Sequence, residues 1–153
     1  MGLSVLAAPS ITPLVERLCA RFADRDEGLL VLTDLIVLIA AADTVIDDTE
    51  KRALAESVET MLSSHVAPRV LRTVVDESRA RIRGIGPDLS ADAIGRKLAA
   101  RRAADDGLRL AIFIAAVSDG ICAVERRRIE RMARAAGVPA GRLDELMADP
   151  YAF

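Results

Sequence analysis

The chain has 153 residues, of which 52% are hydrophobic and only 3% aromatic, and its formal net charge is −2. This length suits one domain with a substantial core, and the abundance of Ala, Leu, Val and Arg favours helices over a β-sandwich. The near-neutral charge argues against bulk electrostatic binding of nucleic acid. The first residues lack a basic n-region, and the run Leu29–Ala42 is shorter than the roughly 20 residues of a membrane span. We therefore expect a cytoplasmic protein without a membrane span.

The charge is distributed unevenly along the chain. Residues 24–59 hold ten acidic and three basic residues, whereas residues 96–134 hold ten basic and five acidic ones. Halves of opposite sign could attract each other or a protein partner.

The first predicted helix starts with Thr12 as its N-cap and Pro13 at its first position. A polar break over 24–28 follows. Residues 29–42 are apolar apart from Thr33 and Asp34, which is typical of a buried helix. Because a buried charge costs several kcal/mol unless it is paired, we expect Asp34 either to pair with an arginine such as Arg81 or Arg109, or to lie on a weakly exposed stripe.

An acidic loop then leads to a predicted helix over about 48–62. The turn 63–65 precedes another helix that begins at Pro68 and ends at 84–87, the clearest boundary inside the chain. The apolar residues expected on the buried side of this helix are Val70, Leu71, Val74, Val75 and Ile82.

The second half repeats this organisation. We predict a helix capped by Ser90, a break at 105–107 and a second apolar helix from Leu108. A helix over about 124–136 follows, with Gly137 as its stop, and a short helix runs from Pro139 to Met147. The total is about eight helices. Two of the four aromatic residues, Tyr151 and Phe153, lie in the tail. They form either a cap on the core, which we favour, or a docking peptide.

The two halves also match in detail. Superposing Asp43 on Asp119 aligns residues 39–41 with 115–117, and Glu50 then falls one place from Glu125. We therefore predict an all-α helical bundle of seven to eight helices built from two related copies, at about 28–83 and 88–147. Residues 1–27 form an N-terminal helix packed on that duplicated domain.

The acidic residues of these junctions have two interpretations. Asp47 and Glu50 have the spacing of a capping box, whereas Glu125 has no such capping partner, because Cys122 would be the N-cap. Asp43 and Asp119 each follow a helix C-terminus, where a carboxylate is unfavourable by about 0.3–1 kcal/mol. Either a neighbouring arginine or free amides compensate them, or a divalent cation is bound by oxygen ligands. The candidate metal ligands are Asp43, Asp47, Glu50, Asp119 and Glu125.

The pattern Ala-Ala-Ala-Asp43-x-x-Ile46-x-x-x-Glu50 and its copy around Asp119 and Glu125 resemble the TerB-like family of tellurite-resistance-associated proteins. The resemblance covers roughly residues 28–147. It implies a duplicated all-helical fold with an Ala-Asp-Gly, apolar, Glu signature at each junction, whose acidic residues are proposed to bind divalent metal. Thr44 stands where that family has Gly, the second loop is one residue shorter, and Asp47 has no acidic counterpart.

The sequence lacks a recognisable catalytic set. His65 is the only histidine, and residues 84–87 do not form a phosphate loop. Asp34 and Asp43 are nine residues apart, about 13 Å along a helix, too far to act on one atom. We expect a non-enzymatic TerB-like accessory or interaction protein in a tellurite or metal-ion stress response, with a protein partner. The alternative is a metal-free scaffold domain that uses the charge asymmetry, including Arg126–Arg128. Cys19 and Cys122 are expected to be buried free thiols.

Overall fold

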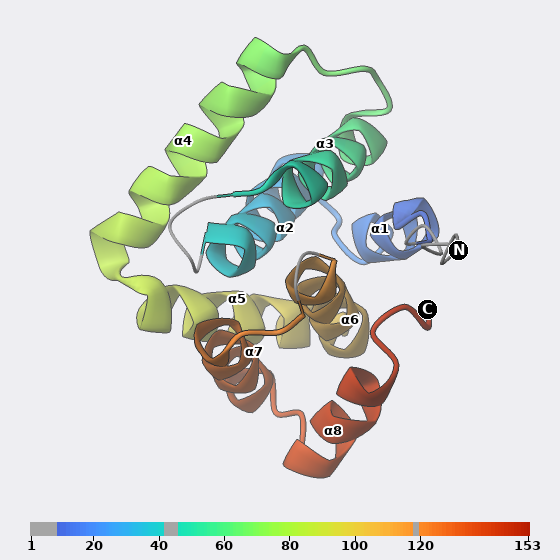
Figure 1. The fold of residues 1–153 in the computed structure, drawn as a ribbon, viewed down its shortest axis with the longest axis vertical. Helices are drawn as coiled ribbons and strands as arrows, with labels where there is room; N and C mark the ends of the chain where they lie inside the picture. The colour runs from blue at the N-terminus through green and yellow to red at the C-terminus, as the bar shows by residue number, and fades with distance from the viewer. Residues whose placement is uncertain (1–8, 42–45, 118–119) are drawn as a thin grey trace, which may run out of the picture.

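Helix α2 is the centre of the fold. The computed structural model describes residues 9–41, 46–117 and 120–153, and within these ranges it contains eight helices and no strand. They are α1 (Thr12–Cys19), α2 (Arg25–Ala40), α3 (Asp48–Leu62), α4 (Pro68–Ile85), α5 (Pro87–Ala100), α6 (Ala104–Ala116), α7 (Ala123–Ala135) and α8 (Ala140–Ala148). Helix α2 packs against every helix from α1 to α7 (Figure 1). The prediction of an all-α bundle is confirmed.

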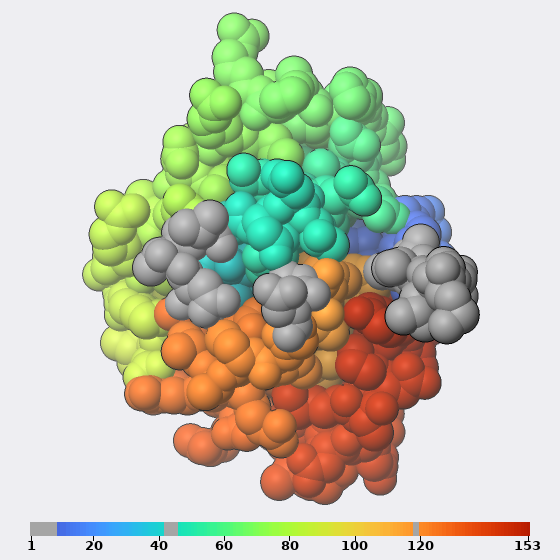
Figure 2. Space-filling model, in the orientation of Figure 1, coloured from blue at the N-terminus to red at the C-terminus, as the bar shows by residue number. Residues whose placement is uncertain are grey.

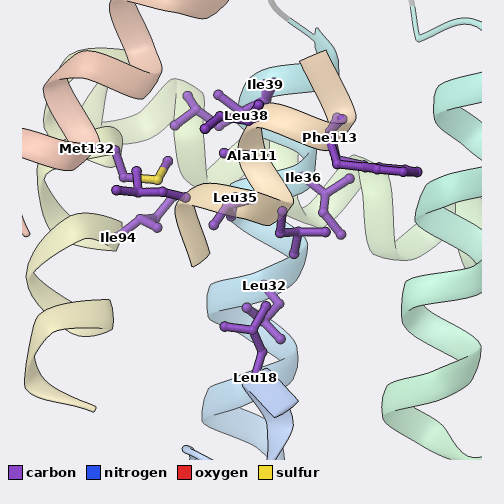
Figure 3. Close-up of a cluster of buried hydrophobic side chains, with 14 of the residues drawn as sticks. Leu18, Leu32, Leu35, Ile36, Leu38, Ile39, Ile94, Ala111, Phe113 and Met132 are labelled. Atoms are coloured by element: carbon purple, nitrogen blue, oxygen red, sulfur yellow. The ribbon is translucent and has the colours of Figure 1, made fainter. Parts of the chain in front are cut away.

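The core is aliphatic, as the low aromatic content predicts. Ten of the sixteen residues of α2 are buried, which is why its sequence is apolar on all sides. Figure 3 shows Leu35 and Leu38 of α2 meeting Ile94 of α5, Ala111 of α6 and Met132 of α7. The core therefore joins the two halves of the sequence rather than separating them.

The two ends of the molecule differ in their packing. Figure 2 shows that the α3–α4 part of the chain forms the narrow upper end of the molecule, and the C-terminal helices form the base. Helix α4 packs on α2 and α5, whereas α3 packs on α1 and α2. Within the described ranges, no helix combines the length and the apolar character needed to cross a membrane.

Several boundaries differ from the predictions. Thr12 is the first residue of α1 rather than its cap, and its amide donates a hydrogen bond to Ser10 Oγ at 3.2 Å. The predicted polar break at 24–28 is the first turn of α2, because Asp24 caps that helix through the amide of Asp26 at 2.9 Å. The predicted domain boundary at residue 28 thus falls inside α2.

The start of the second half also differs. Helix α5 begins at Pro87, directly after Gly86 with φ of 87°, so Ser90 is a buried residue inside the helix and not its cap. Asp105 and Asp106 belong to the first turn of α6, where acidic residues are favourable, and the break lies at 101–103. A proline can start a helix without any side-chain cap, and this rule outweighs the serine signal.

The expected burial of one side of α4 is confirmed only in part, since Leu71, Val75 and Ile82 pack against the core without being fully buried. Leu71, Val74, Val75 and Ile82 are only partly buried, Val70 is 45% exposed, and Ser78 is the one fully buried residue of the helix. The periodicity correctly predicts an amphipathic helix. No neighbouring helix among the described residues covers its apolar side completely.

The aromatic tail caps the core, as predicted. Tyr151 and Phe153 each pack edge-on against Phe113 of α6, with ring centroids 5.6 and 5.7 Å apart. The Arg109 guanidinium donates to the carbonyl of Ala152 at 2.6 Å, and the Tyr151 hydroxyl donates to the carbonyl of Ala116 at 3.2 Å. These contacts fix the C-terminus on α6.

Helices α5 and α7 form the closest helix pair. A Cβ added to Gly95 of α5 would lie 2.3 Å from the Met132 carbonyl oxygen of α7. On the solvent side, Arg131 donates two hydrogen bonds to Asp92, at 2.8 and 2.9 Å. This bidentate contact holds the pKa of Asp92 below its ordinary value.

The free energy of unfolding should therefore fall in acid, because protonation of Asp92 weakens its contact with Arg131. Its lowered folded-state pKa means that the carboxylate stabilises the fold above its unfolded-state pKa of about 3.9, and this stabilisation is lost as the pH falls through the folded-state value. We expect the difference in free energy of unfolding between wild type and D92N to be constant above about pH 5 and to shrink towards pH 2. Urea unfolding at several pH values measures it.

The matched control is D144N, an exposed aspartate of α8 that forms no salt bridge with the described residues. D144N should change the free energy of unfolding little at any pH. If D92N and wild type keep the same difference at pH 2 and pH 7, the Asp92–Arg131 contact does not contribute to stability.

Candidate acidic helix junctions

The junction between α2 and α3 is closed by a capping box, as predicted. Asp47 is the N-cap, and its Oδ1 accepts a hydrogen bond from the Glu50 amide at 2.8 Å. In return, Glu50 Oε1 accepts one from the Asp47 amide at 3.1 Å. The Glu50 side chain lies inside the fold, since the residue is only 4% exposed. This box fixes the direction in which α3 leaves the junction.

The junction between α6 and α7 has the same construction, which the sequence analysis did not expect. Cys122 is the N-cap of α7, and its Sγ accepts a hydrogen bond from the Glu125 amide at 3.4 Å. Glu125 Oε1 accepts one from the Cys122 amide at 2.9 Å, and Glu125 is 3% exposed. The prediction that Glu125 lacks a capping partner is therefore wrong. Cysteine is outside the usual set of cap residues, so the glutamate at the third helical position was the one local signal for this box.

The two capping boxes have the same geometry. Asp47 and Cys122 are both N-caps with extended backbone, at ψ of 172° and 167°, and each precedes its buried glutamate by three residues. Sulfur is a weak acceptor, so the second box depends more on the glutamate. Burial raises the pKa of the Cys122 thiol, which keeps this cap neutral.

The predicted metal ligands are brought together only in part. Asp47 and Glu50 are in direct contact within the first junction, and Glu125 lies at the second. Asp43 and Asp119 are outside the described residues. Among the residues that are described, no three His, Cys, Asp or Glu side chains gather as a metal site.

A basic side chain lies at the end of α2, where the helix dipole favours one. Arg128 of α7 donates through Nη1 to the carbonyl of Leu38 at 2.5 Å. Leu38 is in the last turn of α2, where the helix dipole interacts favourably with a positive charge. An arginine from a neighbouring helix was one of the predicted ways to compensate the Asp43 carboxylate, which itself lies outside the described residues.

Asp34 pairs with Arg81, one of its two predicted partners. The guanidinium donates from Nη2 to Asp34 Oδ1 at 2.7 Å, and the Ser78 hydroxyl donates to the same oxygen at 2.6 Å. The hydrogen bond to Asp34 raises the pKa of Arg81. The group ties α2 to α4. Arg109, the other predicted partner, instead donates to the carbonyl of Ala152 in the C-terminal tail.

The basic residues of α7 are largely neutralised by neighbouring acids. Arg127 pairs with Asp88 at 3.1 Å, Arg131 pairs with Asp88 and Asp92, and Arg126 pairs with Glu130 at 3.1 Å. Charge reversal in this run would therefore also disturb the α5–α7 packing. Binding of a partner protein to this face, without metal, stays a prediction. The ion pairs within the chain leave fewer unpaired positive charges on this face for an acidic partner.

The remaining candidates have structural roles or none. His65 has an 86% exposed side chain in the α3–α4 turn, 3.0 Å from Glu59. Cys19 and Cys122 are both only partly buried, which corrects the expectation of full burial. Burial raises the pKa of Cys19 as well.

Comparisons with protein-family models, with curated proteins and with solved structures found no match. The resemblance to the TerB-like family therefore remains a prediction from the sequence.

Proposed function

We infer that this chain is a non-enzymatic TerB-like module, formed by duplication, that acts as an accessory or interaction protein in a tellurite or metal-ion stress response. The observation that carries this inference is the pair of matched junctions. Each joins a buried apolar helix to an amphipathic one, and each turns a buried glutamate inward at the third helical position. A capping role alone does not require the acid, because glutamine completes such a box equally well.

The negative charge of these glutamates is what a divalent cation would use. Glu50 with Asp43 and Asp47 would supply oxygens at the first junction, and Glu125 with Asp119 at the second. Backbone carbonyls and water would complete the coordination, as is usual for Ca²⁺ and Mg²⁺. The sets are unequal because Cys122 replaces an acid, so the first junction should bind more tightly.

Substitution by glutamine separates the two roles of each glutamate. E50Q and E125Q keep an oxygen for the cap amide but remove the charge. In EDTA we expect both to stay within about 0.5 kcal/mol of wild type, whereas E50A should lose about 1 kcal/mol with its cap. A cation at 100 times its dissociation constant should stabilise wild type by about 2.7 kcal/mol, and E50Q by much less.

Urea unfolding and calorimetric titration with Ca²⁺, Mg²⁺, Mn²⁺ and Zn²⁺ measure these effects. The cation part is wrong if no cation produces heat and E50Q behaves as wild type with and without metal. The glutamates would then be structural caps only.

A further inference from the structure

The incompletely covered side of α4 forms one wall of a groove. Helix α3 and Ile46, which precedes it, form the other wall, and the groove has a volume of about 580 Å³. Its apolar surface consists of Ile46, Leu54, Leu71 and Val75. Ile46 and Leu54 are 6% and 1% exposed and belong to the core, so the groove floor is continuous with the hydrophobic interior.

The residues that α4 contributes form one continuous face. Leu71 and Val75 are four residues apart. Arg72, Asp76 and Arg79 lie beside them, at spacings of four and three residues, and therefore on the same side of the helix. From Pro68 to Arg79 this face is about 16 Å long at 1.5 Å per residue. That is three turns of helix, the length over which an amphipathic helix lays apolar anchors into a groove.

The charges at the edges of the groove are mainly positive. Lys51 lies on the α3 side, and Arg72 and Arg79 lie on the α4 side, against the single acid Asp76. None of these four side chains forms a salt bridge with the described residues. Basic groups on both edges of an apolar floor complement a ligand whose apolar strip is flanked by acids.

We propose that the α3–α4 groove binds an amphipathic helix of a partner protein, about three turns long, with aliphatic residues on one face and Asp or Glu on both sides of it. A helix suits the site better than an acyl chain, because Leu71 and Val75 remain partly exposed along the open side. A helix presents its own polar side to that solvent, whereas an acyl chain would leave apolar surface there. The groove adjoins the first junction, because Ile46 directly precedes Asp47, but the ligand proposed for it is a protein helix rather than a cation.

The test uses a designed peptide of about 14 residues, or four helical turns, labelled with a fluorophore, with Leu on one face and Glu at the flanking positions. A second probe carries Lys in place of Glu. In EDTA, which removes any contribution of a bound cation, anisotropy should show saturable binding of the Glu probe. The Lys probe should bind at least about tenfold more weakly.

Charge reversal identifies the surface. The double variant R72E/R79E should weaken binding of the Glu probe about tenfold or more. The control R69E/R83E makes the same change of charge on exposed residues of the same helix that do not line the groove, and it should bind as wild type does. Equal loss in both variants overturns the proposal, as does an absence of saturable binding or equal binding of both probes.

NMR of the wild-type chain makes the test independent of how the variants fold. The methyl signals of Leu54, Leu71 and Val75 should shift on addition of the Glu probe, while those of Leu143 in α8 stay in place. Unmoved groove methyls overturn the proposal. Shifts of the groove methyl signals when the protein concentration is raised without probe also overturn it, because they indicate that a second copy of the chain occupies the groove. Binding to phosphatidylglycerol vesicles that depends on Arg72 and Arg79, without peptide binding, overturns it as well, because it indicates a membrane surface.

Discussion

G95A should lower the free energy of unfolding by about 3 kcal/mol, near the upper end for an overpacked site. The added Cβ would lie 2.3 Å from the Met132 carbonyl oxygen and 2.9 Å from the Ala135 Cβ. The movement of one flexible side chain cannot relieve this clash, so the backbones of α5 and α7 must move apart. The gain in helix propensity from Gly to Ala, about 1 kcal/mol, offsets only part of this cost. In a chain of this length, thermal unfolding should occur roughly 10 °C lower.

The matched control is G84A in α4. Nothing lies within 4 Å of a Cβ at Gly84, and the residue is helical, so alanine should raise stability by about 0.5–1 kcal/mol. Opposite signs for the two glycines would show that Gly95 is required by the approach of α5 to α7. Equal stability of G95A and wild type would mean that the two helices are further apart than described.

R128M should lower the free energy of unfolding by about 2 kcal/mol, the second-largest loss we expect from a substitution. Methionine keeps much of the apolar stem but removes the donor to the Leu38 carbonyl. That carbonyl lies in the last turn of a buried helix, and Leu38 is 1% exposed, so water cannot readily replace the lost partner. The favourable interaction of a cation with the helix C-terminus is lost as well.

R126M provides the comparison on the same helix. The Arg126 side chain is 55% exposed and makes only an i,i+4 pair with Glu130, a kind of contact worth about 0.3–0.5 kcal/mol. Guanidinium chloride unfolding of both variants should separate them clearly. If R128M is as stable as R126M, the bond to Leu38 does not anchor α7 to α2.

Local signals in the sequence predict the elements well where they are strong. The Asp47 and Glu50 spacing gives the start of α3 at residue 48, and its end at Leu62 also agrees. The Gly86-Pro87 pair ends α4 and begins α5. The errors arise where two local signals compete, as at Ser90, where the proline three residues earlier determines the helix start.

Tertiary relationships are less accessible from one sequence. Periodicity shows that α4 has an apolar side but not that its neighbours leave this side partly uncovered. The Asp34–Arg81 pair was one of several possibilities, because residues 47 positions apart have no local signal. Cys122 was correctly placed at the N-cap of α7, but the acceptor role of its thiol was not expected, since thiols rarely take that role. Asp43 and Asp119, the centre of the metal hypothesis, lie outside the described residues.

The relation between the two junctions is tested most directly by a crystal grown with Mn²⁺ and measured for anomalous scattering. We expect one anomalous peak within coordination distance of a Glu50 oxygen and Asp43, about 2.0–2.3 Å, and a weaker one beside Glu125 and Asp119. Both aspartates should occupy corresponding positions in the two halves. An anomalous map without a peak at either junction, with Asp43 and Asp119 in dissimilar surroundings, would contradict both the cation site and the duplication.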